Sequence, residues 1–597
     1  MVENAQVAEA GGSGPGPLAR TLWHRQLERY PNTGPRYAYL LIVVVATIML
    51  YYQFYVQGAV APQITSQLHM SFPFFVYIVV ISNALGAFGS LFAGLADRWG
   101  RANLVAYGLV FTGAMIAFGV PNSPNKYAYL IMFSSVGFVE GIMLVATPAL
   151  VRDYSPQVGR ASAMGFWTLG PVIGSLIVAE VSSRTVNHFH FWYSGAQGAG
   201  LNGVVWQDQY VVCGIVGLVV AAIAVLFLKE LSPNLRDQLM VSLRDRALVE
   251  ARAKGLDLGE ALRHPWRQMM HLDIVGSAAA ISVFLIVYYT LIGFSVLYFV
   301  FVFNFTTAQA NSLGVWIWAF DAIALVAIGV LSDKVRVRKP FMAVGGLGAI
   351  AMTSLFAYQT YNIHTGYYTF AWILSLLAIF LGFAFSPWMA SFTETVEKRN
   401  PALTATGLAV WGWIIRAIVS ISIFILPYVV TTMTPLFENG PRAQAIQAQF
   451  PAQVQTLTTL NNVVGKNDPQ TLAALQANPN NLAAGLKAAT EIATATHISV
   501  GQATTQLLAL KALPPSDLAF LTAHGAQLQS AQSAAPREWR TWWWVCVGCE
   551  AAFIPFIFVM TGRWSPRRAK RDEQEHQELV ERELQALGTS GGVAAQA

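Results

Sequence analysis

The sequence predicts an all-α membrane protein with twelve transmembrane helices, arranged as two pseudo-symmetric halves of six helices each. The 597 residues are 55% hydrophobic and only 11% charged, whereas about a quarter of the residues are charged in ordinary soluble domains. Apolar runs of about 17 residues or more, long enough to cross about 30 Å of hydrocarbon as a helix, occur twelve times. A charged stretch that interrupts these runs also occurs twice, 236 residues apart.

The apolar runs divide into two sets of six. A more polar stretch, residues 230–272, separates the sets and is expected to form a cytoplasmic linker, because its Arg and Glu residues recur at helical spacing. The twelve expected spans are residues 37–56, 72–95, 104–120, 127–150, 161–179, 210–228, 274–302, 313–331, 341–357, 368–390, 403–430 and 542–560.

Basic residues indicate the orientation of the chain. An even number of spans places both termini on one side, and clusters of Arg and Lys precede the first span and follow the last. By the positive-inside rule, both termini are expected in the cytoplasm of a bacterial cell, with the chain in its inner membrane. The net charge of +6 is therefore a topology signal. The expected partners are the lipid bilayer, a small-molecule substrate and protons, and no nucleic acid.

The remaining segments complete the domain organisation. Residues 1–35 are expected to be a disordered cytoplasmic tail, 36–229 the first half, 273–432 the first five helices of the second half, 541–562 the twelfth helix and 563–597 a cytoplasmic tail. Residues 433–540 are rich in Ala, Gln, Thr and Asn and are expected to be an external insertion of several small helices. A cap over the external mouth is one arrangement for it, and it is a candidate surface for an unidentified partner.

The repeated charged stretch follows the second and eighth spans. FAGLADRWGRANL, residues 92–104, has its counterpart in IGVLSDKVRVRKP, residues 328–340, and Tyr51-Tyr52-Gln53 is echoed by Tyr288-Tyr289-Thr290 at an offset of 237. These matches indicate duplication of a six-span unit, an architecture that places a substrate site between the halves near the middle of the membrane. We call the two charged stretches the first and the second hinge. Their candidate residues are Ala93, Gly94, Asp97, Arg98, Gly100 and Arg101 in the first hinge and Gly329, Asp333, Lys334 and Arg336 in the second.

These hinges resemble the cytoplasmic signature of the major facilitator superfamily. The resemblance covers about 480 of the 597 residues and implies a secondary transporter that works by alternating access, with spans one, four, seven and ten lining the cavity. It also implies a cytoplasmic latch, in which Asp97 contacts the start of span eleven near Leu403 and Asp333 contacts the start of span five near Ala161. A carboxylate can bind the partly positive N-terminus of a neighbouring helix in this way.

A second resemblance lies in the fifth span. Gly170, Pro171 and Gly174 resemble the span-five motif of proton-coupled antiporters of this family. The sequence departs from that pattern at Phe166, where a small residue is usual. It also has Gly137 in span four, where many proton-coupled members have an arginine.

Four charged residues lie inside the predicted spans: Glu140, Asp321, Arg416 and Glu550. An ionised group costs at least about 2.5 kcal/mol at the centre of a membrane helix, so these groups should face protein or a water-filled cavity. Because arginine stays charged, Arg416 needs an anion, which is either resident Asp321 or a visiting substrate. Glu140 is expected to face the cavity and Glu550 to be a structural acid.

Uncharged polar and aromatic residues near the same depth complete the candidate site. The amides are Gln53, Gln57 and Asn83, and the indoles are Trp318 and Trp413. Each also has a structural interpretation, because polar side chains join helices in lipid and tryptophan packs well.

The sequence therefore predicts a proton-coupled transporter of a small organic anion or amphipathic metabolite, with Glu140 or Asp321 as the proton carrier. One alternative is a proton-coupled exporter of an apolar, drug-like compound, and another is a transport-dead membrane sensor. No cofactor, metal site or enzymatic activity is expected. Cys546-x-x-Cys549 lies inside a span and suits packing, and the pair His188 and His190 lacks further ligands.

Overall fold

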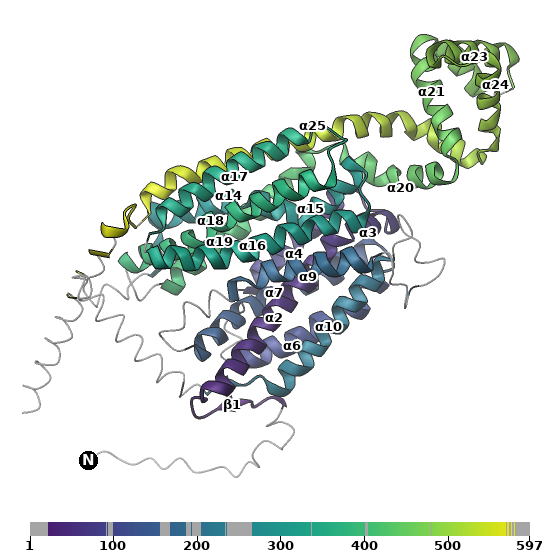
Figure 1. Ribbon diagram of the computed structural model, residues 1–597. Coiled ribbons are helices and arrows are strands. Elements are labelled where there is room, and N and C mark those ends of the chain that lie inside the picture. The colour runs from purple at the N-terminus through teal and green to yellow at the C-terminus, as the bar shows by residue number, and fades with distance from the viewer. Residues whose placement is uncertain are drawn as a thin grey trace, which may run out of the picture.

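The computed structural model describes residues 22–90, 99–155, 167–186, 205–232, 265–335, 337–399, 404–478, 480–560 and 562–568, together with a few isolated positions. Helices make up most of these residues (Figure 1). Eleven of the described helices are long and apolar enough to cross a membrane. Such helices satisfy every backbone hydrogen bond internally, which lipid requires.

In the first half, the spanning helices are α2 (Thr33–Ala59), α4 (Phe72–Gly89), α6 (Arg101–Ala114) continued by η2 (Met115–Gly119) and η3 (Val120–Asn122), α7 (Lys126–Tyr154) and α10 (Trp206–Phe227). In the second half, they are η6 (Leu272–Gly276) continued by α14 (Ser277–Phe284) and α15 (Ile286–Phe303), α16 (Thr307–Val335), α17 (Lys339–Gln359), α18 (Tyr367–Arg399), α19 (Thr404–Val429) and α25 (Pro515–Val559). The short helices α3 (Ala61–Gln67) and α13 (Pro265–Met269) lie outside these spans.

The twelve-helix fold predicted from the sequence is confirmed, and its fifth helix is only partly described. Helix α9 (Gly170–Thr185) is the described part of the predicted span 161–179, and residues 156–166 lie outside the described residues. Its 16 residues are too few to be counted among the eleven long helices. The twelfth helix, α25, begins at Pro515, well before the predicted start, because its Ala- and Gln-rich first part is helical without being apolar.

The two halves repeat the same packing arrangement. Helix α4 packs against α7 in the first half, as α16 packs against α18 in the second, and α6 with α10 corresponds to α17 with α25. Between the halves, α4 packs against α19 and α9 packs against α16. The second helix of each half thus pairs with the fifth helix of the other, which is the relationship expected of a duplicated unit.

Helices α4 and α7 cross at unusually short range because glycines face each other. A Cβ added to Gly141 would lie 1.9 Å from the carbonyl oxygen of Gly86, and one added to Gly137 would lie 2.6 Å from that of Ser82. Small residues allow this approach in membrane helices. A long side chain such as arginine therefore does not fit at position 137 in this packing.

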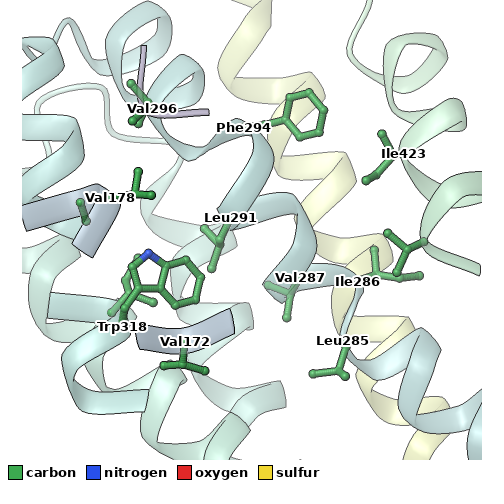
Figure 2. Close-up of a cluster of buried hydrophobic side chains, with 14 of the residues drawn as sticks. Val172, Val178, Leu285, Ile286, Val287, Leu291, Phe294, Val296, Trp318 and Ile423 are labelled. Atoms are coloured by element: carbon green, nitrogen blue, oxygen red, sulfur yellow. The ribbon is translucent and has the colours of Figure 1, made fainter. Parts of the chain in front are cut away.

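Apolar side chains from both halves form one continuous core. Figure 2 shows part of it, with Val172 and Val178 of α9 near Leu291 of α15 and Trp318 of α16. All four side chains are buried. This core connects the two halves beside the candidate site.

The N-terminal tail is ordered from Leu22 onward, which corrects the prediction of disorder over residues 1–35 for this part. Strand β1 (Gln26–Leu27) pairs in parallel with β2 (Glu230–Leu231). Arg25 is only 4% exposed and its guanidinium donates to Asn103 Oδ1 at 2.7 Å and to the carbonyl oxygen of Ala224 at 2.8 Å. These contacts hold the tail against α6 and α10.

The insertion forms a small helical unit with its own core. It contains α20 (Met433–Gln449), α21 (Pro451–Asn467), α22 (Pro469–Ala477), α23 (Leu482–Thr496), α24 (Val500–Ala509), η8 (Leu510–Ala512) and the first part of α25. Buried Leu460, Val464 and Ile492 belong to a hydrophobic cluster that is separate from the membrane core. Helices α21 to α24 stand away from the bundle (Figure 1), and α20 is the part that packs on α3 and α4. These four helices therefore do not form the cap over the mouth that the sequence suggested.

Candidate functional site

Glu140 and Arg416 come from opposite halves and lie close enough to interact electrostatically. Glu140 of α7 is 7% exposed, and Arg416 of α19 is half-buried. Arg416 forms no ion pair within 4 Å among the described residues. A Cβ built on Gly86 would lie 3.9 Å from its Nη1 atom. The short crossing of α4 and α7 thus brings Glu140 and the glycine surface beside the guanidinium group.

Two tyrosines lie within electrostatic range of this charged pair. Tyr51 of α2 and Tyr289 of α15 both interact electrostatically with Glu140 and Arg416. Each ring contacts a further tyrosine on its own helix, Tyr51 with Tyr55 at 5.5 Å and Tyr289 with Tyr288 at 5.4 Å between ring centroids. The hydroxyl groups can donate to an anion, and the rings offer apolar contact.

The sequence analysis did not include these tyrosines among the site residues. The signal was present, because Tyr51 and Tyr288-Tyr289 belong to the repeated segments that supported the duplication. The repeat aligns Tyr51 with Tyr288 and Tyr52 with Tyr289. It therefore points to both tyrosine pairs, but it does not distinguish Tyr51 and Tyr289 from their neighbours.

Asp321 forms no ion pair with Arg416 within 4 Å among the described residues, so the structure does not show it as the resident anion that the sequence analysis considered. The carboxyl group is 4% exposed, and its electrostatic neighbour among the described residues is Tyr288. The Tyr288 ring in turn contacts Trp318 at 5.2 Å. Helix α16 packs on α9 and α18, whereas α19 packs on α4 and α14.

A small pocket lies between the halves next to Trp318. Its polar lining includes Tyr55 of α2, Ser175 of α9, Ser295 of α15 and Asn311 of α16. Aromatic and small residues of both halves thus surround a space that adjoins the tyrosines of the charged site.

Gln53 has a structural position. Its Oε1 accepts a 2.7 Å hydrogen bond from Thr112 Oγ1 of α6, and a Cβ on Gly217 of α10 would lie 1.9 Å from its Nε2. Thr290, at the corresponding position of the second half, accepts a hydrogen bond from Trp542 Nε1 of α25 at 3.2 Å. Both residues therefore join an inner helix to outer helices.

The other uncharged candidates differ in their positions. Gln57 is 4% exposed and its Nε2 has no hydrogen-bond partner among the described residues, so it stays a candidate. Asn83 donates to the carbonyl oxygen of its own helix at Val79, at 2.9 Å. Trp413 is 45% exposed and lies one helical turn before Arg416 on α19, so it also stays a candidate.

The span-five motif fixes α9 against α2 at the site. A Cβ on Gly174 would lie 2.7 Å from the Cβ of Tyr51, and one on Gly170 would lie 2.8 Å from Cγ2 of Thr47. Pro171 stands in the first turn of α9, where its missing N–H leaves no hydrogen bond unmade. The motif therefore positions Tyr51.

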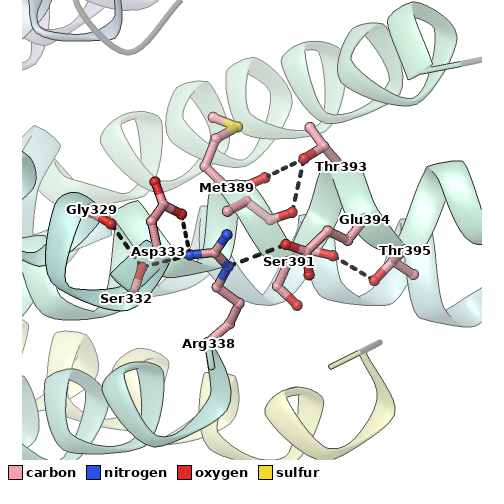
Figure 3. A network of polar contacts seen from close by, with 10 residues as sticks. Gly329, Ser332, Asp333, Arg338, Met389, Ser391, Thr393, Glu394 and Thr395 are labelled. Carbon is pink, nitrogen blue, oxygen red and sulfur yellow. Dashed lines mark hydrogen bonds and ion pairs between the residues drawn. The ribbon is translucent and has the colours of Figure 1, made fainter. Parts of the chain in front are cut away.

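The second hinge is organised by Arg338, which the sequence analysis did not single out. Figure 3 shows its guanidinium between Asp333 of α16 and Glu394 of α18, with oxygens at 2.5 and 3.2 Å. It also donates to Ser332 Oγ at 2.8 Å. The side chain of Lys334 is exposed. Arg336 and Ala161 lie outside the described residues.

The first hinge has a matching contact at Arg101. Its guanidinium pairs with Asp153 of α7 at 2.7 Å, and its backbone N–H donates to the Glu230 carboxylate at 2.6 Å. Arg101 precedes Arg338 by 237 residues, so both copies place an arginine at the start of the third helix and an acid at the end of the fourth. The remaining residues of the first hinge and its expected contact lie outside the described residues, namely Ala93, Gly94, Asp97, Arg98 and Leu403.

Two further small residues serve backbone geometry at the hinges. Gly100 has a φ of +89°, a conformation that favours glycine, and a Cβ there would meet the Glu230 carboxylate at 2.6 Å. A Cβ on Gly329 would lie 2.9 Å from Ser386 Oγ, which marks the close contact of α16 with α18.

Glu550 lies away from the site, between α25 and α17. Its Oε1 accepts a 2.7 Å hydrogen bond from Thr353 Oγ1, and the side chain is fully buried. The described residues contain no group of three or more His, Cys, Asp or Glu that could hold a metal ion. His188 and His190 lie outside the described residues.

Comparisons with known proteins place this geometry in context. A sequence profile of the Major Facilitator Superfamily matches residues 43–440. The structure of a bacterial homolog of the human lysosomal transporter Spinster, in an inward-facing and unoccupied conformation, is similar over 90% of this chain and 100% of that chain, with a TM-score of 0.55 and 16% identity. A D-xylose-proton symporter is similar over 66% of this chain and 90% of that chain, with a TM-score of 0.50 and 14% identity. At these identities the likeness shows the fold alone.

A curated relative matches a shorter part of the chain. The protein "MFS transporter asaE" of Aspergillus flavus is 30% identical over 113 residues, which are 17% of this chain and 25% of that protein. The chain thus spans about a quarter of the length of this relative.

Proposed function

The chain belongs to the major facilitator superfamily and is a secondary transporter of a small molecule, and we propose that it carries an organic anion or amphipathic metabolite by alternating access coupled to protons. The observation that carries the proposal is that Arg416 and Glu140, from opposite halves, lie within electrostatic range of each other and of Tyr51 and Tyr289. A group bound there contacts both halves, so its arrival and departure affect their relative position.

Arg416 is the proposed anion-binding residue. Its guanidinium is half-buried and has no ion pair within 4 Å among the described residues, so a carboxylate can approach it. A planar guanidinium binds a carboxylate through two parallel hydrogen bonds, which gives orientation as well as affinity. The hydroxyl groups of Tyr51 and Tyr289 are additional donors, and the tyrosine and tryptophan rings nearby suit an apolar part of the substrate.

Glu140 is the proposed proton carrier. Arg416 is a positive charge within electrostatic range of Glu140, and a nearby opposite charge favours the ionised form of a carboxylate. A substrate anion competes for Arg416, and Glu140 then loses its counter-charge and takes up a proton. Anion binding at Arg416 is linked in this way to proton uptake at Glu140, and the anion itself does not need to contact Glu140. We assign this role to Glu140 and not to Asp321, because Asp321 forms no ion pair with Arg416 among the described residues.

The contacts between the halves support an assignment of the conformation. On the side of α3 and the insertion, Gln63 Nε2 donates to Thr307 Oγ1 at 2.6 Å, and Asn311 Nδ2 donates to the carbonyl oxygen of Ala59 at 2.8 Å. The basic hinges lie at the opposite ends of the helices, which the positive-inside rule assigns to the cytoplasm of a bacterium. We therefore take the α3 side as external and closed, with both termini cytoplasmic.

Export of an apolar, drug-like compound is the second candidate. It is favoured by the span-five motif and by the aromatic and apolar side chains that meet between the halves, among them Trp318, Leu291 and Val178. In this case Arg416 interacts electrostatically with Glu140 and does not bind the substrate, so the substrate needs no negative charge.

A thermal-shift screen of the purified protein separates these candidates. A ligand at 100 times its dissociation constant stabilises the folded state by about 2.7 kcal/mol. We expect stabilisation by carboxylates and its loss in Arg416→Gln, with Arg540→Gln as the matched control because Arg540 contacts Tyr361 away from the site. Stabilisation by lipophilic cations and by no carboxylate would replace the anion proposal with the export proposal.

A further inference from the structure

The first helix of the insertion reaches both halves of the membrane bundle. Helix α20 packs against α3 and α4 of the first half and against α25 of the second half. Its apolar side chains Met433, Leu436 and Phe437 are buried there. We propose that α20 is part of the external gate, with Phe437 as a wedge that holds the external side closed.

Phe437 lies between aromatic rings of the two halves. Its ring is 5.2 Å from that of Phe72, the first residue of α4, and 5.0 Å from that of Phe301 in α15, with which it is stacked. Phe72 also contacts Phe294 of α15 edge-on at 6.1 Å. Phe72 and Phe437 are at most 1% exposed. The four rings therefore form one buried cluster across the boundary between the halves.

Helix α20 is fixed to the second half at its start. The Glu538 carboxylate of α25 accepts hydrogen bonds from the Thr432 N–H at 2.8 Å, from Thr432 Oγ1 at 2.7 Å and from Thr431 Oγ1 at 2.8 Å. A carboxylate at a helix N-terminus is favourable because the N–H groups there lack partners within the helix. Movement of the second half therefore carries α20 and Phe437 with it.

The wedge acts together with contacts that the membrane helices make themselves. Gln63 binds Thr307, and Asn311 binds the carbonyl oxygen of Ala59. A Cβ on Gly58 of α2 would lie 2.7 Å from the carbonyl oxygen of Ile292 in α15, so the helices touch there. Opening of the external side separates α2 and α4 from α15. Opening must also separate Phe437 from Phe72. The free energy of opening therefore includes the loss of one aromatic pair.

This inference rests on the alternating access of the proposed function, and its test needs neither substrate nor proton gradient. The three native cysteines, Cys213, Cys546 and Cys549, are first replaced. Spin labels are then attached to cysteines at Ser66 in α3 and Ala308 in α16, in protein reconstituted in nanodiscs. Distances between the labels, measured by pulsed electron paramagnetic resonance, report the closed and open external side.

We expect Phe437→Ala to raise the ratio of long to short distances about 2- to 10-fold, the change expected from losing one aromatic pair. Glu538→Gln should raise it in the same direction, because it loosens α20 while leaving all four rings in place. Gly58→Ala supplies the distance of the open state, since its methyl group forces α2 from α15. Leu508→Ala, on the exposed surface of α24, should match the parent protein.

Phe437→Leu keeps most of the apolar volume and provides a second variant if the alanine variant does not fold. An intermediate ratio in the leucine variant supports the wedge. The proposal would be overturned if a folded Phe437 variant gave the same distance distribution as the parent protein while Gly58→Ala shifted that distribution. Failure of anion binding in the thermal-shift screen would leave this result unaffected, so the two proposals fail separately.

Discussion

Arg416 of α19 and Glu140 of α7 come from opposite halves and lie within electrostatic range of each other, and a Cβ added to Gly86 would be in van der Waals contact with the Arg416 guanidinium, 3.9 Å from Nη1. Neither residue forms an ion pair within 4 Å among the described residues. A pair that spans two moving bodies changes its separation in each transport cycle. This relationship is what makes the pair suited to coupling.

Substitution of Arg416 by lysine tests the anion site. Arg416→Lys keeps the charge and loses the planar fork of donors, so the affinity for a carboxylate substrate should fall about tenfold, the value of one hydrogen bond to a charged group. Calorimetric titration of the purified variant measures this change. Equal affinity in the lysine variant, or full transport in Arg416→Gln, would remove Arg416 from the site.

The membrane helices could be predicted from the sequence because lipid imposes a strong requirement. A spanning helix needs a long apolar run, and such runs are visible without any knowledge of packing. The predicted and observed bounds of the third, fourth and ninth spans differ by at most four residues at either end. The start of α25 was missed because its first part projects from the membrane and is helical for reasons other than hydrophobicity.

The candidate site was predicted less completely because it depends on which face of each helix points inward. Glu140 and Arg416 could be selected, since a charge inside a span stands out. The sequence left Asp321 and a visiting substrate as alternative partners of Arg416, and no ion pair with Asp321 is seen among the described residues. Tyr51 and Tyr289 were missed because tyrosine is common in membrane helices, and only the three-dimensional packing distinguishes them from Tyr52, which is buried against α10.

The hinge arginine is expected to control the rate of transport. Arg338→Gln removes the ion pairs with Asp333 and Glu394, and the transport rate should fall while the melting temperature changes little. Asp333 is 68% exposed, and such partly exposed pairs contribute about 0–1 kcal/mol to stability. Uptake assays with matched expression levels measure the rate. The control is Lys334→Gln, because Lys334 lies in the same hinge and has no ion pair among the described residues. Equal transport rates in the Arg338→Gln and Lys334→Gln variants would contradict a latch at Arg338.

Residue accessibility tests the orientation. Cysteines introduced at Pro124 and Gln476, both exposed on the α3 side, should react in intact cells with a thiol reagent that does not cross membranes. A cysteine at exposed Pro566 should react only after the cells are opened. Labelling of Pro566→Cys in intact cells, with protection of the other two, would reverse the assignment of the external side.

The insertion should lose stability in acid. Hydrogen bonds from Lys487 of α23 and from Thr471 lower the pKa of Asp468 to about 2. Because the folded-state pKa is lowered, the contribution of this carboxylate to stability is complete above its unfolded pKa of about 3.9 and is lost as the pH falls toward 2. Pepsin cleavage of the full chain within α22 and α23 should therefore accelerate from pH 4 to pH 2.

The control for this prediction is Asp468→Asn. Asparagine caps the start of α22 as well as aspartate does, but it cannot titrate or pair with Lys487. The change in cleavage between pH 4 and pH 2 should be smaller in this variant, after correction for the intrinsic pH dependence of pepsin. An unchanged difference would show that another group causes the acid sensitivity.

Gradient-driven accumulation in proteoliposomes tests the central claim, that Glu140 carries the coupled proton beside Arg416, most directly. Glu140→Gln keeps the shape of the side chain and cannot exchange a proton. The account predicts that this variant no longer concentrates the substrate when a pH gradient is imposed, yet still exchanges it at equal pH, whereas Asp321→Asn retains accumulation. Accumulation at the parent level in Glu140→Gln, or its loss only in Asp321→Asn, would contradict the account.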